Sequence, residues 1–138
     1  MLIPRFRSLS RPSFPIKSLL EQARRDAPME SCGYLLGPDR QTVTLNYPMR
    51  NTDQSAEHFS FDPKEQFAAV KYVRQHGLVI VGNWHSHPAT PSRPSAEDIR
   101  LAFDPNILYF ILSLAGEKPV FNAFAIADGE VKEKICLR

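Results

Sequence analysis

The sequence has no long apolar run, and only two of its 138 residues are cysteine. No stretch approaches the ~20 apolar residues that a membrane-spanning helix requires, so we expect neither a membrane protein nor a membrane partner. We interpret Cys32 and Cys136 as buried free thiols in a reducing compartment, because a chain of this size needs no disulfide. The N-terminal stretch lacks the apolar core of a secretory signal peptide. We therefore expect a cytoplasmic protein.

Positive charge is scarce outside the N-terminal part of the chain. Residues 1–25 hold six basic side chains and a single acidic one, Glu21, whereas the remainder is slightly acidic. A nucleic-acid-binding domain usually carries a basic stripe across its body. We interpret residues 1–14, approximately, as a solvated basic arm, and we expect no nucleic-acid partner.

Length and composition indicate a single domain over residues 1–138, with 43% hydrophobic and 23% charged residues. Apolar spacing and capping residues predict helices over 15–27, 63–76 and 95–103. Apolar or alternating runs predict strands over 32–37, 41–49, 58–63, 78–87, 106–114, 119–126 and 130–137. We expect a tight turn at 127–129 and burial of the start of 78–87 on both faces. This order predicts an α/β sandwich, a mixed sheet with helices on its faces.

Two of the four histidines lie one residue apart in the segment NWHSHPATPSRPSAED, residues 83–98. His85 and His87 are at positions i and i+2 of a strand end, so both rings point to the same side. Asp98 lies in the first turn of the next helix and completes a set of three ligands. Two imidazoles and one carboxylate leave a fourth position open, as in catalytic zinc sites, although the ligand types also suit iron or manganese.

A hydrolytic metal site also needs a base and an oxyanion donor. Glu30, at a helix-to-strand junction, is the candidate base, and its alternative is a solvated loop acid. Ser95 either caps the third helix, stabilises an oxyanion, or does both. Trp84 and Tyr34 are better explained by core packing than by substrate contact. Only proximity argues for a role of Asn83, and His58 and His76 have no identifiable partner.

The segment E…GYLLG followed by GNWHSHPATPSRPSAED resembles the JAMM or MPN+ (Mov34/Pad1) metalloprotease family. The resemblance covers nearly the whole chain, and Glu30, His85, His87, Ser95 and Asp98 match the family signature position by position. It implies a cytidine-deaminase-like three-layer sandwich and one Zn²⁺ per chain. The implied roles are metal ligands for His85, His87 and Asp98, with Glu30 as the base and Ser95 as the oxyanion donor.

The implied activity is hydrolysis of peptide or isopeptide bonds after the C-terminal Gly-Gly of ubiquitin-like proteins. The chain lacks the long insertions of eukaryotic deubiquitinases and resembles compact prokaryotic members, which implies a ubiquitin-fold sulfur-carrier protein as substrate. It departs from the related RadC pattern, His-Asn-His-Pro-Ser-Gly, at Ser86 and at Ala89 and Thr90.

Two other functions compete with this hypothesis. One is a non-catalytic module that binds ubiquitin-like proteins and keeps a structural metal, but such a site gains nothing from an open position and a base. The other is a zinc deaminase, which would need His-x-Glu and Pro-Cys-x-x-Cys. The sequence contains neither pattern.

Overall fold

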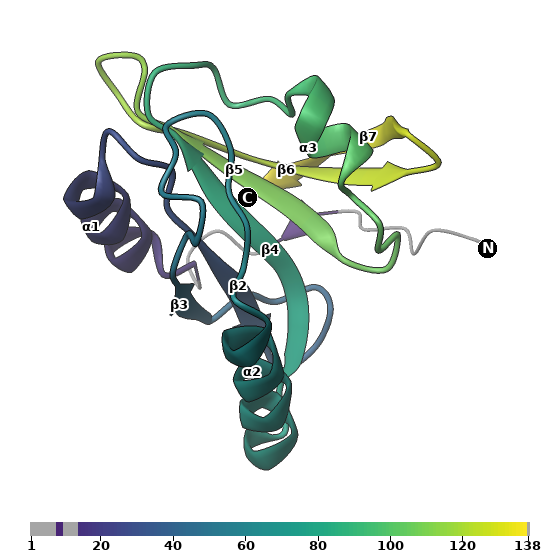
Figure 1. Cartoon of the computed structure of the whole chain (residues 1–138). Helices are drawn as coiled ribbons and strands as arrows, with labels where there is room; N and C mark the ends of the chain where they lie inside the picture. The colour runs from purple at the N-terminus through teal and green to yellow at the C-terminus, as the bar shows by residue number, and fades with distance from the viewer. Residues whose placement is uncertain (1–7, 10–13, 138) are drawn as a thin grey trace.

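The computed structural model describes residues 8–9 and 14–137. Its elements, shown in Figure 1, are β1 (Ser8–Leu9), α1 (Ile16–Asp26), β2 (Cys32–Gly37), β3 (Leu45–Met49), α2 (Pro63–His76), β4 (Val79–His87), α3 (Ala96–Arg100), β5 (Leu108–Ser113), β6 (Val120–Ala127) and β7 (Glu130–Leu137). In the described residues, no helix combines the length and apolar character needed to cross a membrane.

The strands form one mixed sheet in the order β1-β7-β6-β5-β4-β2-β3. The pairs β4–β5 and β1–β7 are parallel, and the other neighbouring strands are antiparallel. β4 and β5 run side by side through the centre of the molecule (Figure 1). The predicted mixed sheet is therefore confirmed.

The two faces of the sheet pack against different helices. On one face, Trp84 of β4 shares a buried cluster with Leu19 of α1. On the opposite face, Ala69 of α2 packs against β2, and Ile99 of α3 packs against Ile111 of β5. Helices thus cover both sides of the sheet, which confirms the predicted three-layer α/β sandwich.

The local signals at the ends of α2 behave as the sequence predicts. The Asp62 side chain caps its first turn by accepting a hydrogen bond from the Lys64 backbone (3.0 Å), and Pro63 is the first helical residue. The helix ends at Gly77, whose φ of 63° is a left-handed conformation that glycine adopts at little cost.

The third helix is shorter than the predicted range 95–103, because α3 comprises only the five residues Ala96–Arg100. The chain then turns at Asp104, whose backbone N–H and C=O both bond to the Tyr109 hydroxyl (3.1 and 2.8 Å). Asp104 also precedes proline, which disfavours helical geometry. As a result, Leu101 and Phe103 are 47% and 81% exposed.

The predicted strand 58–63 was also wrong. Within this range the backbone makes only an isolated bridge, from Phe61 to Asn51, before α2 begins. The loop that contains it is held instead by side-chain hydrogen bonds, described below.

Burial of β4 increases along the strand, which contradicts the prediction for its start. Val79 and Ile80 are half-buried, whereas residues 84–87 are buried. The reason is strand pairing: Val79 and Ile80 pair only with β2, and β5 joins the other side of β4 from Gly82 onward.

The N-terminal arm is not wholly solvated. Ser8 and Leu9 form β1, the Leu9 side chain is fully buried, and Phe14 packs in the cluster that contains α1. The basic residues Arg5, Arg7 and Arg11 of the predicted arm lie outside the described residues.

Candidate metal centre

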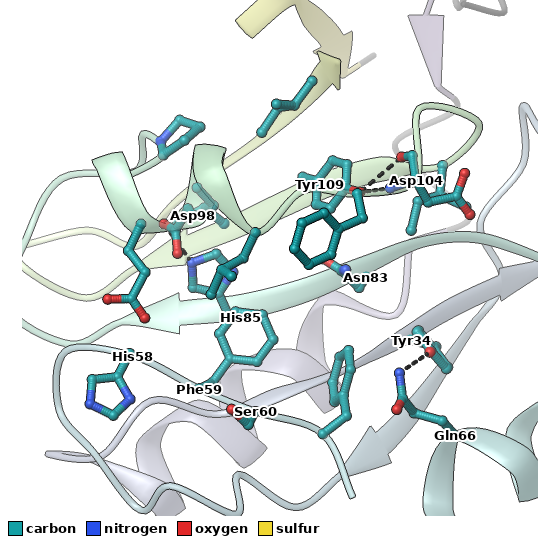
Figure 2. A pocket seen from close by; sticks show the side chains of 18 residues that line it. Tyr34, His58, Phe59, Ser60, Gln66, Asn83, His85, Asp98, Asp104 and Tyr109 are labelled. Atoms are coloured by element: carbon teal, nitrogen blue, oxygen red, sulfur yellow. Dashed lines mark hydrogen bonds and ion pairs between the residues drawn. The ribbon is translucent and has the colours of Figure 1, made fainter. Parts of the chain in front are cut away.

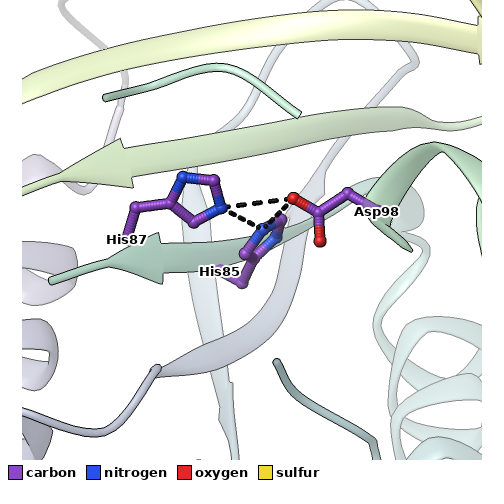
Figure 3. Close-up of side chains that lie close together, drawn as sticks. All are labelled: His85, His87 and Asp98. Carbon is purple, nitrogen blue, oxygen red and sulfur yellow. Dashed lines mark hydrogen bonds and ion pairs between the residues drawn. The ribbon is translucent and has the colours of Figure 1, made fainter. Parts of the chain in front are cut away.

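His85, His87 and Asp98 converge on one point at the end of β4 (Figure 3). The Nε2 atoms of the two histidines lie 3.0 Å apart. Asp98 Oδ2 lies 3.0 Å from His85 Nε2 and 3.2 Å from His87 Nε2. Both histidines are buried, at 3% and 5% exposure. The structure therefore brings together the three residues predicted as ligands.

The chemistry of this cluster suits a cation. His87 Nδ1 lies 2.8 Å from the Pro91 carbonyl, to which it donates, so Nε2 directs a lone pair toward the cluster. Burial lowers the pKa of His85, which favours its neutral, metal-binding form. Burial alone would raise the pKa of Asp98, but its close contacts with the two histidines lower it, so its carboxylate stays ionised. Two imidazole nitrogens and one carboxylate oxygen form a donor set typical of catalytic zinc.

The capping box of α3 positions the carboxylate ligand. The Asp98 backbone donates to Ser95 Oγ (3.0 Å), and the Ser95 backbone donates to Asp98 Oδ2 (2.9 Å), the atom that faces the histidines. Ser95 is therefore observed as the cap of the helix. It is exposed and does not line the neighbouring cavity.

Glu30 is buried near this cluster, with 3% exposure. It lies two residues before Cys32, which pairs with His85, and it is close enough to His87 and Asp98 for their charges to act on it. It lines a second hollow, with residues of α1 and β3, rather than the cavity beside His85. Burial raises its pKa to about 8, while the charge of His87 acts in the opposite direction. Its Oε1 is buried and has no hydrogen-bond partner among the described residues, so the hydrogen-bonding capacity of this atom is unused.

Asn51 is a residue that the sequence analysis missed. Its Nδ2 donates to the carbonyls of Glu30 (3.1 Å) and His58 (3.0 Å), and its Oδ1 accepts from the backbones of Asp53 (3.0 Å) and Ser60 (3.2 Å). All four hydrogen-bonding positions of the amide are used. Asn51 thus joins the loop 52–61 to the backbone of Glu30.

The same loop carries Phe59, which was also missed. Its ring stacks on His85, with centroids 4.6 Å apart and an interplanar angle of 24°. The segment FSFDP provides the only sequence signal for this contact, and there it predicts a strand rather than a loop over a metal ligand.

A cavity of about 430 Å³ begins beside His85 and Asp98 (Figure 2). Its floor includes Tyr34, Asn83 and Tyr109, which are neighbours on three adjacent strands. Residues 58–61 and Gln66 contribute to one side, and residues of α3 and the following loop contribute to the other.

The remaining candidates have clear places in the structure. Trp84 is fully buried and donates to Asn46 Oδ1 (2.9 Å), which confirms core packing. Tyr34 also packs in a buried cluster, with Cys32, and it lines the cavity as well. Cys32 is a buried free thiol, as predicted, and the side chain of Cys136 is not described. His58 does have a partner, because its Nδ1 lies 2.9 Å from Asp53 Oδ2.

Comparisons with known proteins identify the family. The family model described as prokaryotic homologues of the JAB domain matches residues 16–127. A CysO-cysteine peptidase of Mycobacterium tuberculosis is 31% identical over 121 residues, covering 86% of this chain and 83% of that protein. A desampylase of Haloferax volcanii is 35% identical over 105 residues, covering 72% of this chain and 76% of the relative.

Solved structures show the same fold. A solution structure of a Desulfitobacterium hafniense protein superposes with a TM-score of 0.80 at 49% identity, covering 95% of this chain and 92% of that one. A JAB1/MPN domain protein of Archaeoglobus fulgidus superposes with a TM-score of 0.61 at 20% identity, covering 98% of this chain and 100% of the other. The chain therefore belongs to the family of prokaryotic JAB-domain homologues and is a hydrolase of the JAMM type.

Proposed function

We propose that this protein is a zinc-dependent peptidase or isopeptidase that hydrolyses the bond after the C-terminal Gly-Gly of a ubiquitin-fold sulfur-carrier protein. The observation that carries the proposal is the buried His85–His87–Asp98 cluster at the end of a cavity, with the unpartnered Glu30 carboxyl beside it. Relatives named as a CysO-cysteine peptidase, desampylases and a probable TtuB-protein conjugate cleaving protease support the substrate class. A cytoplasmic location fits the free thiol of Cys32.

In this proposal the chain holds the metal and moves the protons. His85, His87 and Asp98 would hold the metal, and zinc bound there would supply an activated water and polarise the carbonyl under attack. Glu30 accepts the water proton at Oε1 and later delivers it to the departing amine. Because Glu30 is buried, its carboxyl is shielded from bulk solvent.

Ser95 contributes to the oxyanion in the same proposal. Its oxygen accepts the hydrogen bond that caps α3, and this leaves the hydroxyl hydrogen free to donate. The cap and the oxyanion role are therefore compatible in one conformation of the side chain.

The extended tail of the carrier adds alongside residues 59–61. Ser60 directs its carbonyl toward Thr52, whose N–H donates to it (3.0 Å). The His58 carbonyl and both main-chain groups of Ser60 are bonded to Asn51 and Thr52, whereas no described residue bonds the main-chain groups of Phe59 and Phe61. These groups form an edge for strand addition, the binding mode in which main-chain hydrogen bonds supply affinity.

A non-catalytic scaffold with a structural metal is the alternative. The buried carboxyl of Glu30 argues against it, because an unpartnered buried acid costs free energy and contributes nothing to a purely structural site.

Mass spectrometry of a carrier extended beyond Gly-Gly tests the proposal. CysO and TtuB carriers with additional C-terminal residues, or joined to a lysine side chain, are incubated with zinc-loaded protein and with a chelated control. We expect zinc-dependent loss of the residues after Gly-Gly, with the new carrier end at the second glycine. If every carrier stays intact while zinc is confirmed bound, the scaffold becomes the better explanation.

A substitution at Asn51 tests whether the loop positions the base. Asn51→Asp removes both donors and places a carboxylate oxygen opposite the carbonyls of Glu30 and His58. We expect kcat to fall about 10- to 100-fold, because small displacements of a catalytic group are costly. Stability should fall by about 1–3 kcal/mol, measured by urea unfolding.

Asn46→Asp is the matched control. Asn46 is also a buried asparagine of the same strand region, but its Nδ2 donates to Ser18 and Gln22, on the opposite face of the sheet from the cluster. We expect a similar loss of stability with nearly unchanged kcat. Equal kcat in the two variants would remove Asn51 from the role of positioning residue.

A further inference from the structure

Asn83 carries an unused hydrogen-bonding group in the floor of the cavity. It lies two residues before His85 on β4, so both side chains project from the same face of the sheet, and both line the cavity (Figure 2). Asn83 Oδ1 is buried and has no partner among the described residues. Such an acceptor is rare in folded proteins, because burying it without a donor costs free energy.

The neighbouring polar groups of the floor are already engaged. Tyr34 pairs across the sheet with Asn83, and its hydroxyl accepts from Gln66 Nε2 (3.1 Å). Tyr109, on the other side, donates its hydroxyl to the Asp104 carbonyl (2.8 Å). In this row of three residues, the Asn83 amide is the group without a protein partner.

The backbone of the floor cannot replace Asn83. β4 is an interior strand that pairs with β2 on one side and β5 on the other, so its N–H and C=O groups serve the sheet. A chain that crosses this floor must therefore find its polar partners among the side chains.

We infer that Asn83 is a substrate-positioning residue whose Oδ1, shielded from solvent in the free protein, turns toward the carrier tail on binding and accepts one of its main-chain N–H groups, and this inference rests on the proposed function. A Gly-Gly tail has no side chains to recognise, so its recognition depends on main-chain hydrogen bonds. Two residues of extended chain span about 6.6 Å, so Asn83 lies about two tail residues from the metal ligand His85. The N–H concerned therefore belongs to a residue two or three positions before the scissile bond.

This contact complements the edge formed by residues 59–61. A tail that pairs with this edge uses the main-chain groups of every second tail residue. The N–H groups of the alternate tail residues point away from the edge and still need acceptors. Asn83 supplies an acceptor to one of these remaining donors. The oxygen of a side-chain amide accepts hydrogen bonds as a peptide carbonyl does. A contact with a main-chain N–H favours an extended tail and does not depend on the side chains of that tail.

The test replaces one tail amide at a time. A semisynthetic CysO carrier is prepared with each of its last four tail amides changed to an ester, which removes the N–H and keeps the length. Equilibrium binding to the zinc-loaded Glu30→Gln protein, which is not expected to turn over substrate, is measured by fluorescence anisotropy. We expect one ester, two or three residues before the scissile bond, to weaken binding about tenfold.

Variants assign that loss to a side chain. Asn83→Ala should bind the all-amide carrier about tenfold more weakly and lose little more with the critical ester. Asn83→Asp retains an acceptor oxygen, so the critical ester should weaken its binding about as much as it weakens binding to the parent. A merely structural role of Asn83 would not produce this difference between the Ala and Asp variants. Asn46→Ala, which removes a buried amide on the opposite face, should leave the penalty as in the parent.

The outcomes separate this inference from the proposed function. If the carrier binds and every ester penalty is the same in Asn83→Ala as in the parent, the assignment of Asn83 is wrong while the function stands. If the carrier does not bind the parent at all, both the substrate class and the role of Asn83 are overturned.

Discussion

Glu30→Gln is expected to lower the rate of carrier hydrolysis by about 10³-fold, within the range that general acid–base catalysis contributes. Glutamine has nearly the shape of glutamate but cannot accept the proton of the water or return it to the leaving amine. Because Glu30 is buried with an unpartnered Oε1, the neutral amide should be accommodated without loss of stability. Single-turnover rates for the carrier extended beyond Gly-Gly measure the effect.

Two controls make this result specific. Zinc content and thermal unfolding of Glu30→Gln should match the parent, which excludes loss of the site as the cause. Ser95→Asp keeps the acceptor that caps α3 but replaces the hydroxyl hydrogen by a negative charge, so a Ser95 that faces the oxyanion should make this variant slower than the parent in the same assay. Near-normal turnover of Glu30→Gln would show that another group is the base.

Asp98→Ala is expected to weaken zinc binding by at least about 100-fold, since even residues that only support metal ligands contribute 10- to 100-fold. The carboxylate is one of three converging donor groups, and its loss leaves two imidazoles. The substitution also removes half of the capping box of α3. Competition with a fluorescent zinc chelator measures the affinity, and circular dichroism follows the fold.

Asp98→Asn and Glu97→Gln separate the two roles of this carboxylate. Asp98→Asn keeps a cap acceptor for the Ser95 backbone but loses the charge, so it should fold like the parent and still bind zinc weakly. Glu97 precedes Asp98 on the same short helix, and its side chain is 44% exposed. Glu97→Gln should bind zinc nearly as the parent does. If Asp98→Ala retained parental affinity, the assignment of this ligand would be wrong.

The convergence of the three proposed metal ligands could be predicted because local geometry determines it. Strand alternation places His85 and His87 on one side whatever the rest of the fold does, and the motif that caps a helix at Ser95 also orients Asp98. The helix 63–76 could be predicted for the same reason, because Pro63 at its start and Gly77 at its end affect the backbone only within a few residues.

Other features depend on residues distant in sequence, and single-sequence patterns did not reveal them. The extent of burial along β4 follows from where β5 begins to pair, and the stacking of Phe59 on His85 requires a loop folded back across the sheet. No sequence pattern distinguishes Asn51 from other polar residues, because the four backbone groups that bond its amide come together only in the folded chain.

The sequence by itself determined the α/β class and indicated the proposed ligand set and the candidate base, because spacing, capping and alternation are properties of short segments. Tertiary structure alone decided that residues 59–61 form a wall of the cavity, and that Glu30 Oε1 and Asn83 Oδ1 are buried without a partner in the part of the chain that the structure describes. Burial and hydrogen-bond satisfaction are set by which strands and loops become neighbours. That information is distributed over the whole chain rather than contained in any one motif.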